Sequence, residues 1–223
     1  MRRVCVFDVN ETLLDLKGLD KHFVTIFGDS SLRKAWFAQF LQSALVTTAT
    51  NSYRKFGDIG VGALEMLAAR QGVRLVEEHR SLIRDGMRHL PAHPDVRESL
   101  ENLRRAGIRM ATLTNSTEEV AEAQLKNADI REYFEQVLSA DTVHRLKPAP
   151  EAYHMAASKL GLSIDRVRLV AAHAWDIAGA LRAGCAAAFV ARPGMVLDPL
   201  FERPDVVGTD LREVSSEILR RET

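Results

Sequence analysis

Four groups of polar side chains follow short apolar segments of the chain. Each residue type among them can take part in hydrolysis: carboxylates, an ammonium group, a hydroxyl, an amide and an imidazole. In a parallel sheet such positions meet at one edge, where ligands bind. The sequence therefore predicts a catalytic site built from Asp8; Thr114 and Asn115; Lys147; and His173, Trp175 and Asp176.

The chemistry suggests a role for each group. Asp8 is a candidate nucleophile, since a carboxylate attacks when it is held in line with its target. Lys147 would keep it ionised. Thr114 and Asn115 would hold substrate oxygens. Asp176 would either hold Lys147 or orient a water. A single aspartate after a strand is more often a turn or cap residue than a catalyst, so the prediction rests on all four groups together.

The elements that position these groups alternate between strand and helix. The apolar runs 4–7, 108–113, 167–172 and 186–191 are typical of strands buried on both faces, and residues 137–138 indicate another. Helices are expected over 95–106, 116–127, 151–160 and 176–183, with Ser116 and Glu119 at capping-box spacing. This pattern predicts an α/β fold with a doubly wound parallel sheet.

Residues 15–90 have a different pattern. Aromatic and aliphatic residues recur there at helical spacing, and no strand is expected. We interpret the segment as a helical insert after the first strand, with helices broken at Gly57, Gly60 and Gly62. Its aromatic stripe, Trp36, Phe37 and Phe40, is either the core of the insert or a lid over a pocket. The predicted domains are thus a core (1–14 and 91–223) and an insert (15–90).

Composition narrows the class of protein. Thirty basic residues balance thirty acidic ones, which argues against a nucleic-acid partner. No apolar run is long enough to cross a membrane or to act as a signal peptide. Cys5 and Cys185 are expected to be buried free thiols, and a cytoplasmic location follows as the default.

The motifs resemble those of the haloacid dehalogenase (HAD) superfamily. The segment 7–13 resembles its first motif, in which a threonine, here Thr12, follows the nucleophile by four residues. Segments 113–115, 147–150 and 175–180 resemble the second, third and fourth motifs, in family order. The resemblance implies a Rossmann-like HAD core with a helical cap in the position of the insert.

Within the superfamily, the pair Trp175–Asp176 and the run from Lys147 to Tyr153 are similar to type II 2-haloacid dehalogenases. These enzymes hydrolyse a carbon–halogen bond without metal or other cofactor. The resemblance implies that Asp8 displaces halide from a short 2-haloacid, and that water, assisted by Lys147 and Asp176, releases the 2-hydroxyacid. It also implies that the substrate-binding residues are Asn10, Thr12, Phe37, Thr114, Asn115, Tyr153, His173 and Trp175.

Some positions depart from this pattern. Phe37 stands where those dehalogenases have a cap arginine, for which Arg33, Lys34 or Arg54 are candidate substitutes. Alanines and His173 replace a serine–serine–asparagine run. His173 could donate to a halide or a carboxylate, or be a structural histidine at a helix start.

Two alternatives stay open. One is a magnesium-dependent phosphatase of the same fold acting on a small metabolite. It would lack the family's second aspartate, since Asn10 occupies that position, and would need Glu11 or Asp141 as an extra carboxylate. The other is a non-catalytic binding protein. The family also suggests a homodimer formed through the cap.

Overall fold

One six-stranded, fully parallel sheet organises the molecule in the computed structural model, which describes residues 2–222. The strand order is β3-β2-β1-β4-β5-β6, so β1 is central and pairs with β2 and β4. The strands are β1 (Val4–Phe7), β2 (Met110–Thr114), β3 (Gln136–Ser139), β4 (Val167–Ala171), β5 (Ala186–Val190) and β6 (Val206–Gly208). The predicted α/β fold is confirmed, and β6 is the strand that the sequence did not predict.

Nine α-helices occur in the described part of the chain. They are α1 (Asp20–Phe27), α2 (Leu32–Ala49), α3 (Phe56–Gln71), α4 (Glu77–Arg88), α5 (Val96–Arg105), α6 (Glu118–Asn127), α7 (Pro150–Lys159), α8 (Ala174–Ala183) and α9 (Leu211–Glu222). Short 3-10 turns are η1 (Leu16–Leu19), η2 (Arg131–Tyr133), η3 (Ala140–Val143) and η4 (Ile164–Arg166).

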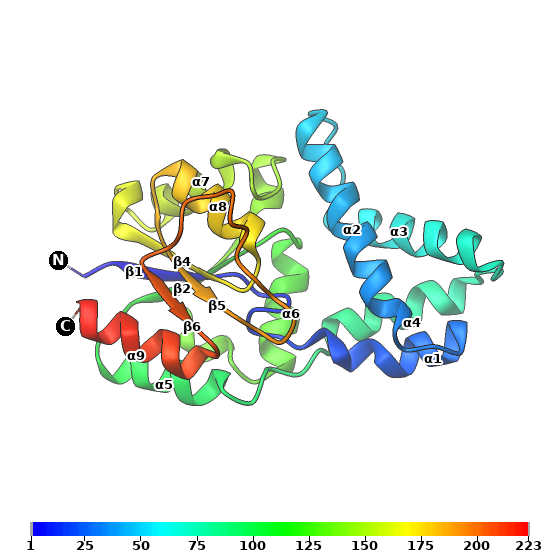
Figure 1. The fold of residues 1–223 in the computed structure, drawn as a ribbon, viewed down its shortest axis with the longest axis horizontal. Helices are drawn as coiled ribbons and strands as arrows, with labels where there is room; N and C mark the ends of the chain where they lie inside the picture. Colours follow the sequence, from blue (N-terminus) through cyan, green and yellow to red (C-terminus); the bar gives the residue numbers. More distant parts are fainter. Residues whose placement is uncertain (1, 223) are drawn as a thin grey trace.

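Alternating residues of β1 face two separate hydrophobic cores. Cys5 and Phe7 pack in the core that α5, α6 and α9 cover, whereas Val4 and Val6 pack against α7 and α8 on the other face (Figure 1). This is the two-residue period of a strand, and burial of both faces explains why β1 contains apolar residues only. Both cysteines are buried free thiols, as predicted.

The start of α6 differs from the prediction. Thr117, not Ser116, is the N-cap, and its hydroxyl accepts a hydrogen bond from the backbone N–H of Val120. The Ser116 carbonyl instead accepts a hydrogen bond from the hydroxyl of Ser139, which joins the ends of β2 and β3. The helix therefore begins one residue later than predicted, and Asn115 and Ser116 form a bend between β2 and its N-cap.

Helices α1–α4 form a group of their own beside the sheet (Figure 1), and residues 15–90 contain no strand. The expectation that Gly57, Gly60 and Gly62 break helices is wrong, since all three lie inside α3. Gly60 serves close packing: a Cβ atom there would lie 2.9 Å from the Phe40 ring of α2. The indole N–H of Trp36 donates to the Gly60 carbonyl at 2.9 Å, which fixes α2 against α3.

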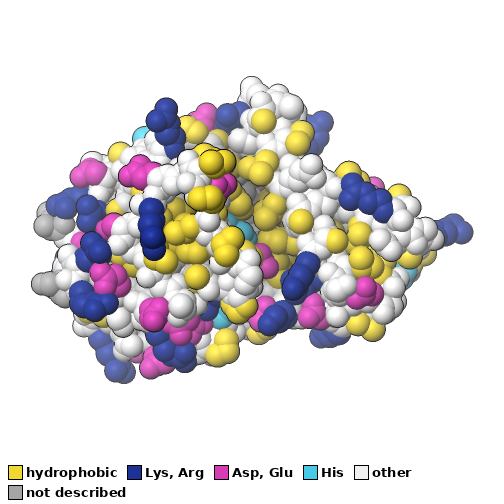
Figure 2. Space-filling view, in the orientation of Figure 1, with side chains coloured by type: hydrophobic (Ala, Val, Ile, Leu, Met, Phe, Trp, Pro, Cys, Tyr) yellow, Lys and Arg dark blue, Asp and Glu magenta, His cyan; other side chains and the backbone are white. Residues whose placement is uncertain are grey.

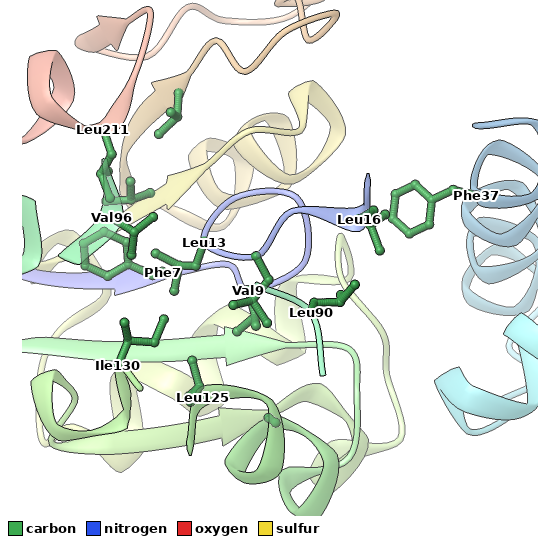
Figure 3. Packing of buried hydrophobic residues seen from close by; sticks show 14 of the residues in the cluster. Phe7, Val9, Leu13, Leu16, Phe37, Leu90, Val96, Leu125, Ile130 and Leu211 are labelled. Atoms are coloured by element: carbon green, nitrogen blue, oxygen red, sulfur yellow. The ribbon is translucent and has the colours of Figure 1, made fainter. Parts of the chain in front are cut away.

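The aromatic stripe of α2 belongs to the buried part of this helical group, and it also reaches the sheet domain. Trp36, Phe37 and Phe40 are all buried. Figure 3 shows Phe37 projecting from α2 toward Leu16, which lies just after the first strand and its turn. Among residues 2–222, no helix is both long and apolar enough to traverse a lipid bilayer.

Candidate active site

Asp8 follows β1 directly and lies beneath a small cavity at the carboxyl edge of the sheet. The cavity and the solvent-open space at its mouth together have a volume of about 260 Å³. Loops after β1, β2 and β4 form its floor, and α2 and α3 supply apolar residues on the opposite side. The lining residues are Asp8, Asn10, Phe37, Leu41, Phe56, Thr114, Asn115, Lys147, His173 and Trp175. Most of the residues that the sequence singled out are therefore brought together.

The Asp8 carboxylate is buried and held at both oxygens. Oδ1 accepts a hydrogen bond from Lys147 Nζ at 3.0 Å, and Oδ2 accepts one from the Thr12 hydroxyl at 2.6 Å. Burial by itself would raise the pKa of Asp8, but the Lys147 ammonium, with His173 and Thr12 beside it, holds this pKa well below its usual range. Asp8 is therefore a carboxylate at any ordinary pH, in the state that a nucleophile needs.

Lys147 is completely buried between two carboxylates. Its Nζ lies 2.5 Å from Asp176 Oδ2 as well as 3.0 Å from Asp8 Oδ1. Burial lowers the pKa of Lys147, yet the charges of Asp176 and Asp8 outweigh it and raise this pKa above the usual value. The lysine is preceded by Leu146 and followed by a cis peptide bond to Pro148. Its ammonium group is thus a fixed positive charge under Asp8.

Asn115 positions the Lys147 backbone. Its Oδ1 accepts from the Lys147 N–H at 2.8 Å, and its Nδ2 donates to the Lys147 carbonyl at 3.4 Å. Asn115 borders the cavity, but its amide is already engaged within the protein. In this structure Asn115 therefore supports Lys147, and its contact with substrate stays a prediction.

Asp176 and Tyr153 lie behind Lys147 and do not line the cavity. The Tyr153 hydroxyl donates to Asp176 Oδ1 at 2.6 Å, and both side chains are completely or almost completely buried. Burial raises the pKa of Asp176 although Lys147 opposes the shift. The Tyr153 hydroxyl therefore faces Asp176 in this structure, and the contact of Tyr153 with substrate stays a prediction.

Thr12 also acts inside the protein. Its hydroxyl donates to Asp8 Oδ2 and accepts from the N–H of Ala172 at 2.9 Å, so it joins the end of β1 to the end of β4. The contact of Thr12 with substrate stays a prediction. Thr114 does line the cavity. Its oxygen accepts from the Ser116 N–H at 3.2 Å, which leaves its own hydroxyl hydrogen available. Asn10 lines the cavity with its Oδ1 bound to Gln124 at 3.0 Å.

His173 precedes α8 and faces two acidic side chains. Its Nε2 lies 3.1 Å from Glu11 Oε2, and its Nδ1 lies 3.6 Å from Asp8 Oδ2. Burial lowers the pKa of His173, but the two carboxylates more than reverse this and raise it to about 9. The partnership with Glu11 was not predicted. The two residues are 162 positions apart in the sequence, and no local pattern links them.

Trp175 and Phe37 complete the wall around the imidazole. The Trp175 ring stacks on His173 with centroids 5.4 Å apart, and the Phe37 ring lies 6.0 Å from the same histidine. The indole N–H of Trp175 is buried and has no hydrogen-bond partner in the described chain. A buried donor of this kind at a cavity is a natural contact for an anionic ligand.

Comparisons with known proteins agree with this geometry. Residues 2–184 match the family model described as haloacid dehalogenase-like hydrolase. The chain is similar to the (S)-2-haloacid dehalogenase of Pseudomonas sp. strain YL, at 28% identity over 93% of this chain and 90% of that protein. It is also similar to (S)-2-haloacid dehalogenase 4A of Burkholderia cepacia, at 30% identity over 82% and 80% of the two chains.

A solved dehalogenase structure with an intermediate complex has the same fold. It superposes with a TM-score of 0.89 at 27% identity and covers 97% of this chain and 96% of that one. The chain belongs to the haloacid dehalogenase-like hydrolase family. It is an enzyme of the (S)-2-haloacid dehalogenase-like class of these hydrolases.

Some haloacid dehalogenase-like hydrolases need magnesium, but the donor set here does not fit a divalent cation. The Lys147 ammonium lies between Asp8 and Asp176, the two carboxylates that would have to hold the ion. Residues 2–222 contain no cluster of three or more potential metal-binding side chains. Of the two extra carboxylates considered from the sequence, Glu11 binds His173 and Asp141 accepts a hydrogen bond from Tyr53.

An outer cleft of this hydrolase leads to the cavity. It has about 1620 Å³ of empty space and shares Phe37, Leu41, His173 and Trp175 with the cavity. Figure 2 shows hydrophobic side chains and histidine gathered in the hollow between the sheet domain and α1–α4. Arg33 and Lys34 border this cleft, and Arg54 does not. None of these three residues borders the cavity above Asp8.

Proposed function

We propose that this hydrolase cleaves the carbon–halogen bond of a short 2-haloacid through an ester on Asp8. The observation that carries the proposal is the pair formed by Asp8 and Lys147. A buried ammonium keeps the Asp8 carboxylate ionised, and that carboxylate faces a small, mostly apolar cavity. The named activities of similar proteins, (S)-2-haloacid dehalogenases, support the same reaction.

In the first step, an oxygen of Asp8 bonds to C2 of the haloacid while the bond from C2 to the halogen breaks. The halide leaves with the bonding electrons, and no proton transfer is needed. Phe37, Leu41 and Phe56 line the cavity and exclude water from the reacting atoms. The apolar surroundings also favour attack by a carboxylate that has lost most of its hydration.

The substrate carboxylate needs donors, and two lie free at the cavity. The Thr114 hydroxyl and the Trp175 indole N–H have hydrogens that no described residue accepts. We propose that they bind the carboxylate and so orient C2 toward Asp8. The cavity is small, which favours a short acid of two or three carbons over a longer one.

In the second step, water attacks Cγ of the ester. The bond between Cγ and the ester oxygen breaks, and the 2-hydroxyacid leaves with an oxygen that came from Asp8. One proton of the water ends on that oxygen, and the other is released to solvent as Asp8 becomes a carboxylate again. Lys147 would stabilise the negative charge that develops on the ester carbonyl oxygen. We further propose that residues 15–90 act as a cap that encloses the substrate during both steps.

The test is halide release from purified protein in the presence of EDTA. L-2-chloropropionate and fluoroacetate are the substrates, and the Asp8→Asn variant is the control, because an amide does not attack. We expect halide release from the wild-type protein and none from the variant. Equal release from both, or phosphatase activity that requires magnesium without any halide release, would contradict the proposal.

A further inference from the structure

Gln124 of α6 connects the cavity to the helical group. Its side chain is completely buried, and α6 packs there against α4. Its Nε2 donates to the Met87 carbonyl at 2.8 Å and to Asn10 Oδ1 at 3.0 Å. Met87 lies in the last turn of α4, where helix carbonyls have no partner within the helix. One amide group therefore contacts both a residue that lines the cavity and the end of a helix outside the sheet domain.

The Met87 carbonyl determines which way both amides point. A carbonyl only accepts hydrogen bonds, so the part of Gln124 that faces it is the N–H2 group. The same group faces Asn10, which therefore turns its oxygen toward Gln124. Asn10 borders the cavity, and its Nδ2 is neither bonded to a described residue nor among the fully buried atoms without a partner. Nδ2 is thus the amide atom that Asn10 presents to the cavity.

The other end of the Gln124 amide shows that this orientation has a cost. Oε1 is buried and accepts no hydrogen bond within residues 2–222. A buried acceptor without a partner is rare in proteins and calls for an explanation. If the amide turned over, Oε1 could accept from the N–H2 group of Asn10, but it would then face the Met87 carbonyl oxygen. Contact with α4 therefore selects the orientation in which Asn10 offers hydrogens to the cavity.

The backbone of Asn10 is fixed, so its amide is the part that can turn. Asn10 forms a bridge with Leu14, and Leu14 forms a second bridge with Ala92. The Glu11 N–H also donates to the Leu14 carbonyl at 2.8 Å. These contacts hold the main chain of the turn after β1 without constraining the rotation of the Asn10 side-chain amide. The hydrogen bond from Gln124 supplies that constraint.

We propose that Gln124 is a positioning residue that turns Asn10 Nδ2 toward the substrate carboxylate, to which Nδ2 donates. The proposal rests on the function proposed above, in which the Thr114 hydroxyl and the Trp175 indole N–H also donate to this carboxylate. A carboxylate has about four acceptor positions, so it accommodates a third donor. With both amides reversed, Asn10 would present its oxygen and repel the anion.

The test compares two replacements of Gln124. In Gln124→Glu the side chain only accepts, so it draws the N–H2 group of Asn10 away from the cavity. Gln124→Met is similar in size and leaves the Asn10 amide free to take either orientation. We expect KM for L-2-chloropropionate to rise at least about tenfold in Gln124→Glu and less in Gln124→Met. Because binding is lost without a change in the reacting groups, kcat should stay within about twofold of wild type.

Propionate gives a readout that does not depend on activity. It carries the carboxylate and no halogen, and its Kd is measured by isothermal titration calorimetry. The Kd should rise by the same factor as KM in each Gln124 variant. Asn10→Ala should weaken propionate binding by itself, and adding Gln124→Glu to it should weaken binding no further. Repulsion by the new glutamate charge would instead persist without the Asn10 amide.

Asn127→Leu is the matched control. Asn127 donates to the Arg88 carbonyl at 2.8 Å, so the variant removes a neighbouring hydrogen bond between α6 and α4. No hydrogen bond joins Asn127 to Asn10 in the described part of the chain, so KM and the propionate Kd should equal those of wild type. An equal rise in this control would mean that contact with α4, and not the Asn10 amide, affects binding, and would overturn the proposal.

Three further results would overturn it: an unchanged propionate Kd in Asn10→Ala, equal effects of Gln124→Glu and Gln124→Met, or a Gln124→Glu effect that persists in Asn10→Ala. Failure of the proposed function gives a different result. A wild-type protein that releases no halide from either haloacid contradicts that function, and the propionate Kd values still decide whether Gln124 orients Asn10 toward a carboxylate.

Discussion

Lys147 Nζ lies 3.0 Å from Asp8 Oδ1, and the lysine side chain is completely shielded from solvent. The contact joins residues 139 positions apart and brings the loop before α7 under the end of β1. Because the ammonium is buried, its attraction for Asp8 is screened far less than that of a surface ion pair. The protonation state of Asp8 therefore depends on this one residue more than on solution pH.

Replacing Lys147 by methionine should reduce both activity and stability. The variant leaves Asp8 and Asp176 as two buried carboxylates without a counter-charge. We expect kcat for halide release to fall at least about 10³-fold, and the free energy of unfolding to fall by about 3 to 5 kcal/mol. Lys126→Met removes an exposed lysine of α6 and is the control for urea unfolding. A near-normal rate in Lys147→Met would remove Lys147 from the catalytic set.

Folding stability should depend on the protonation of His173. Its pKa is raised to about 9 in the folded protein from an ordinary value of 6.5. A raised pKa stabilises the folded state fully below pH 6.5, and this contribution is lost as the pH rises through 9. The urea midpoint of the wild-type protein should therefore decline between pH 6.5 and pH 9. The free energy of unfolding should fall by up to about 3 kcal/mol over the same range. His173→Gln should lack this decline, and an identical decline in both proteins would refute the assignment.

The apolar residues on the α2 side of the cavity should determine how fast different halides are displaced. Phe37 provides no positive charge, so a small, strongly hydrated fluoride gains no electrostatic help from the α2 side of the cavity. We expect fluoroacetate to react at least about 100-fold more slowly than chloroacetate. Phe37→Arg should reduce the ratio of the chloroacetate rate to the fluoroacetate rate. Phe37→Leu keeps the side chain apolar and should leave this ratio unchanged. Equal rates for the two acids in the wild-type protein would show that another group assists fluoride.

A contact between the helical group and the core should hold the cavity closed. The Tyr53 hydroxyl, in the loop between α2 and α3, donates to Asp141 of η3, and its ring stacks on His144 with centroids 4.6 Å apart. Tyr53→Phe should raise KM about threefold to tenfold with little change in kcat, the effect of losing one hydrogen bond. Tyr133→Phe in η2 is the control. An unchanged KM would mean that the cavity closes without this contact.

Strand positions were predictable where burial on both faces leaves an uninterrupted apolar run. The runs 4–7 and 186–191 correspond closely to β1 and β5. β6 has only three residues after a long irregular segment, so it has no such signature. Helix α9 is strongly charged along most of its length, and its buried side is limited to every third or fourth residue. β6 forms one edge of the sheet and α9 packs beside it against α5, and neither element was predicted.

The residue types of the site were predictable from their order along the chain, but their partners were not. Strand order brings Asp8, Thr114 and His173 to one edge, which the alternation of elements already implies. Whether a hydroxyl faces substrate or another side chain depends on ångström-scale packing. That is why Thr12 and Tyr153 turned out to hold Asp8 and Asp176. Gly60 failed as a helix breaker because its close contact with Phe40 of α2 outweighs its low helix propensity.

The most direct measurement is a single turnover in water labelled with oxygen-18, with enzyme in excess over L-2-chloropropionate. If Asp8 forms an ester that water opens at Cγ, the label enters the Asp8 carboxylate and the lactate produced carries none. Mass spectrometry of the peptide containing Asp8 and of the product reads both sites. Label in the lactate hydroxyl and none in the peptide would mean that water attacks C2 directly, and would contradict covalent catalysis by Asp8.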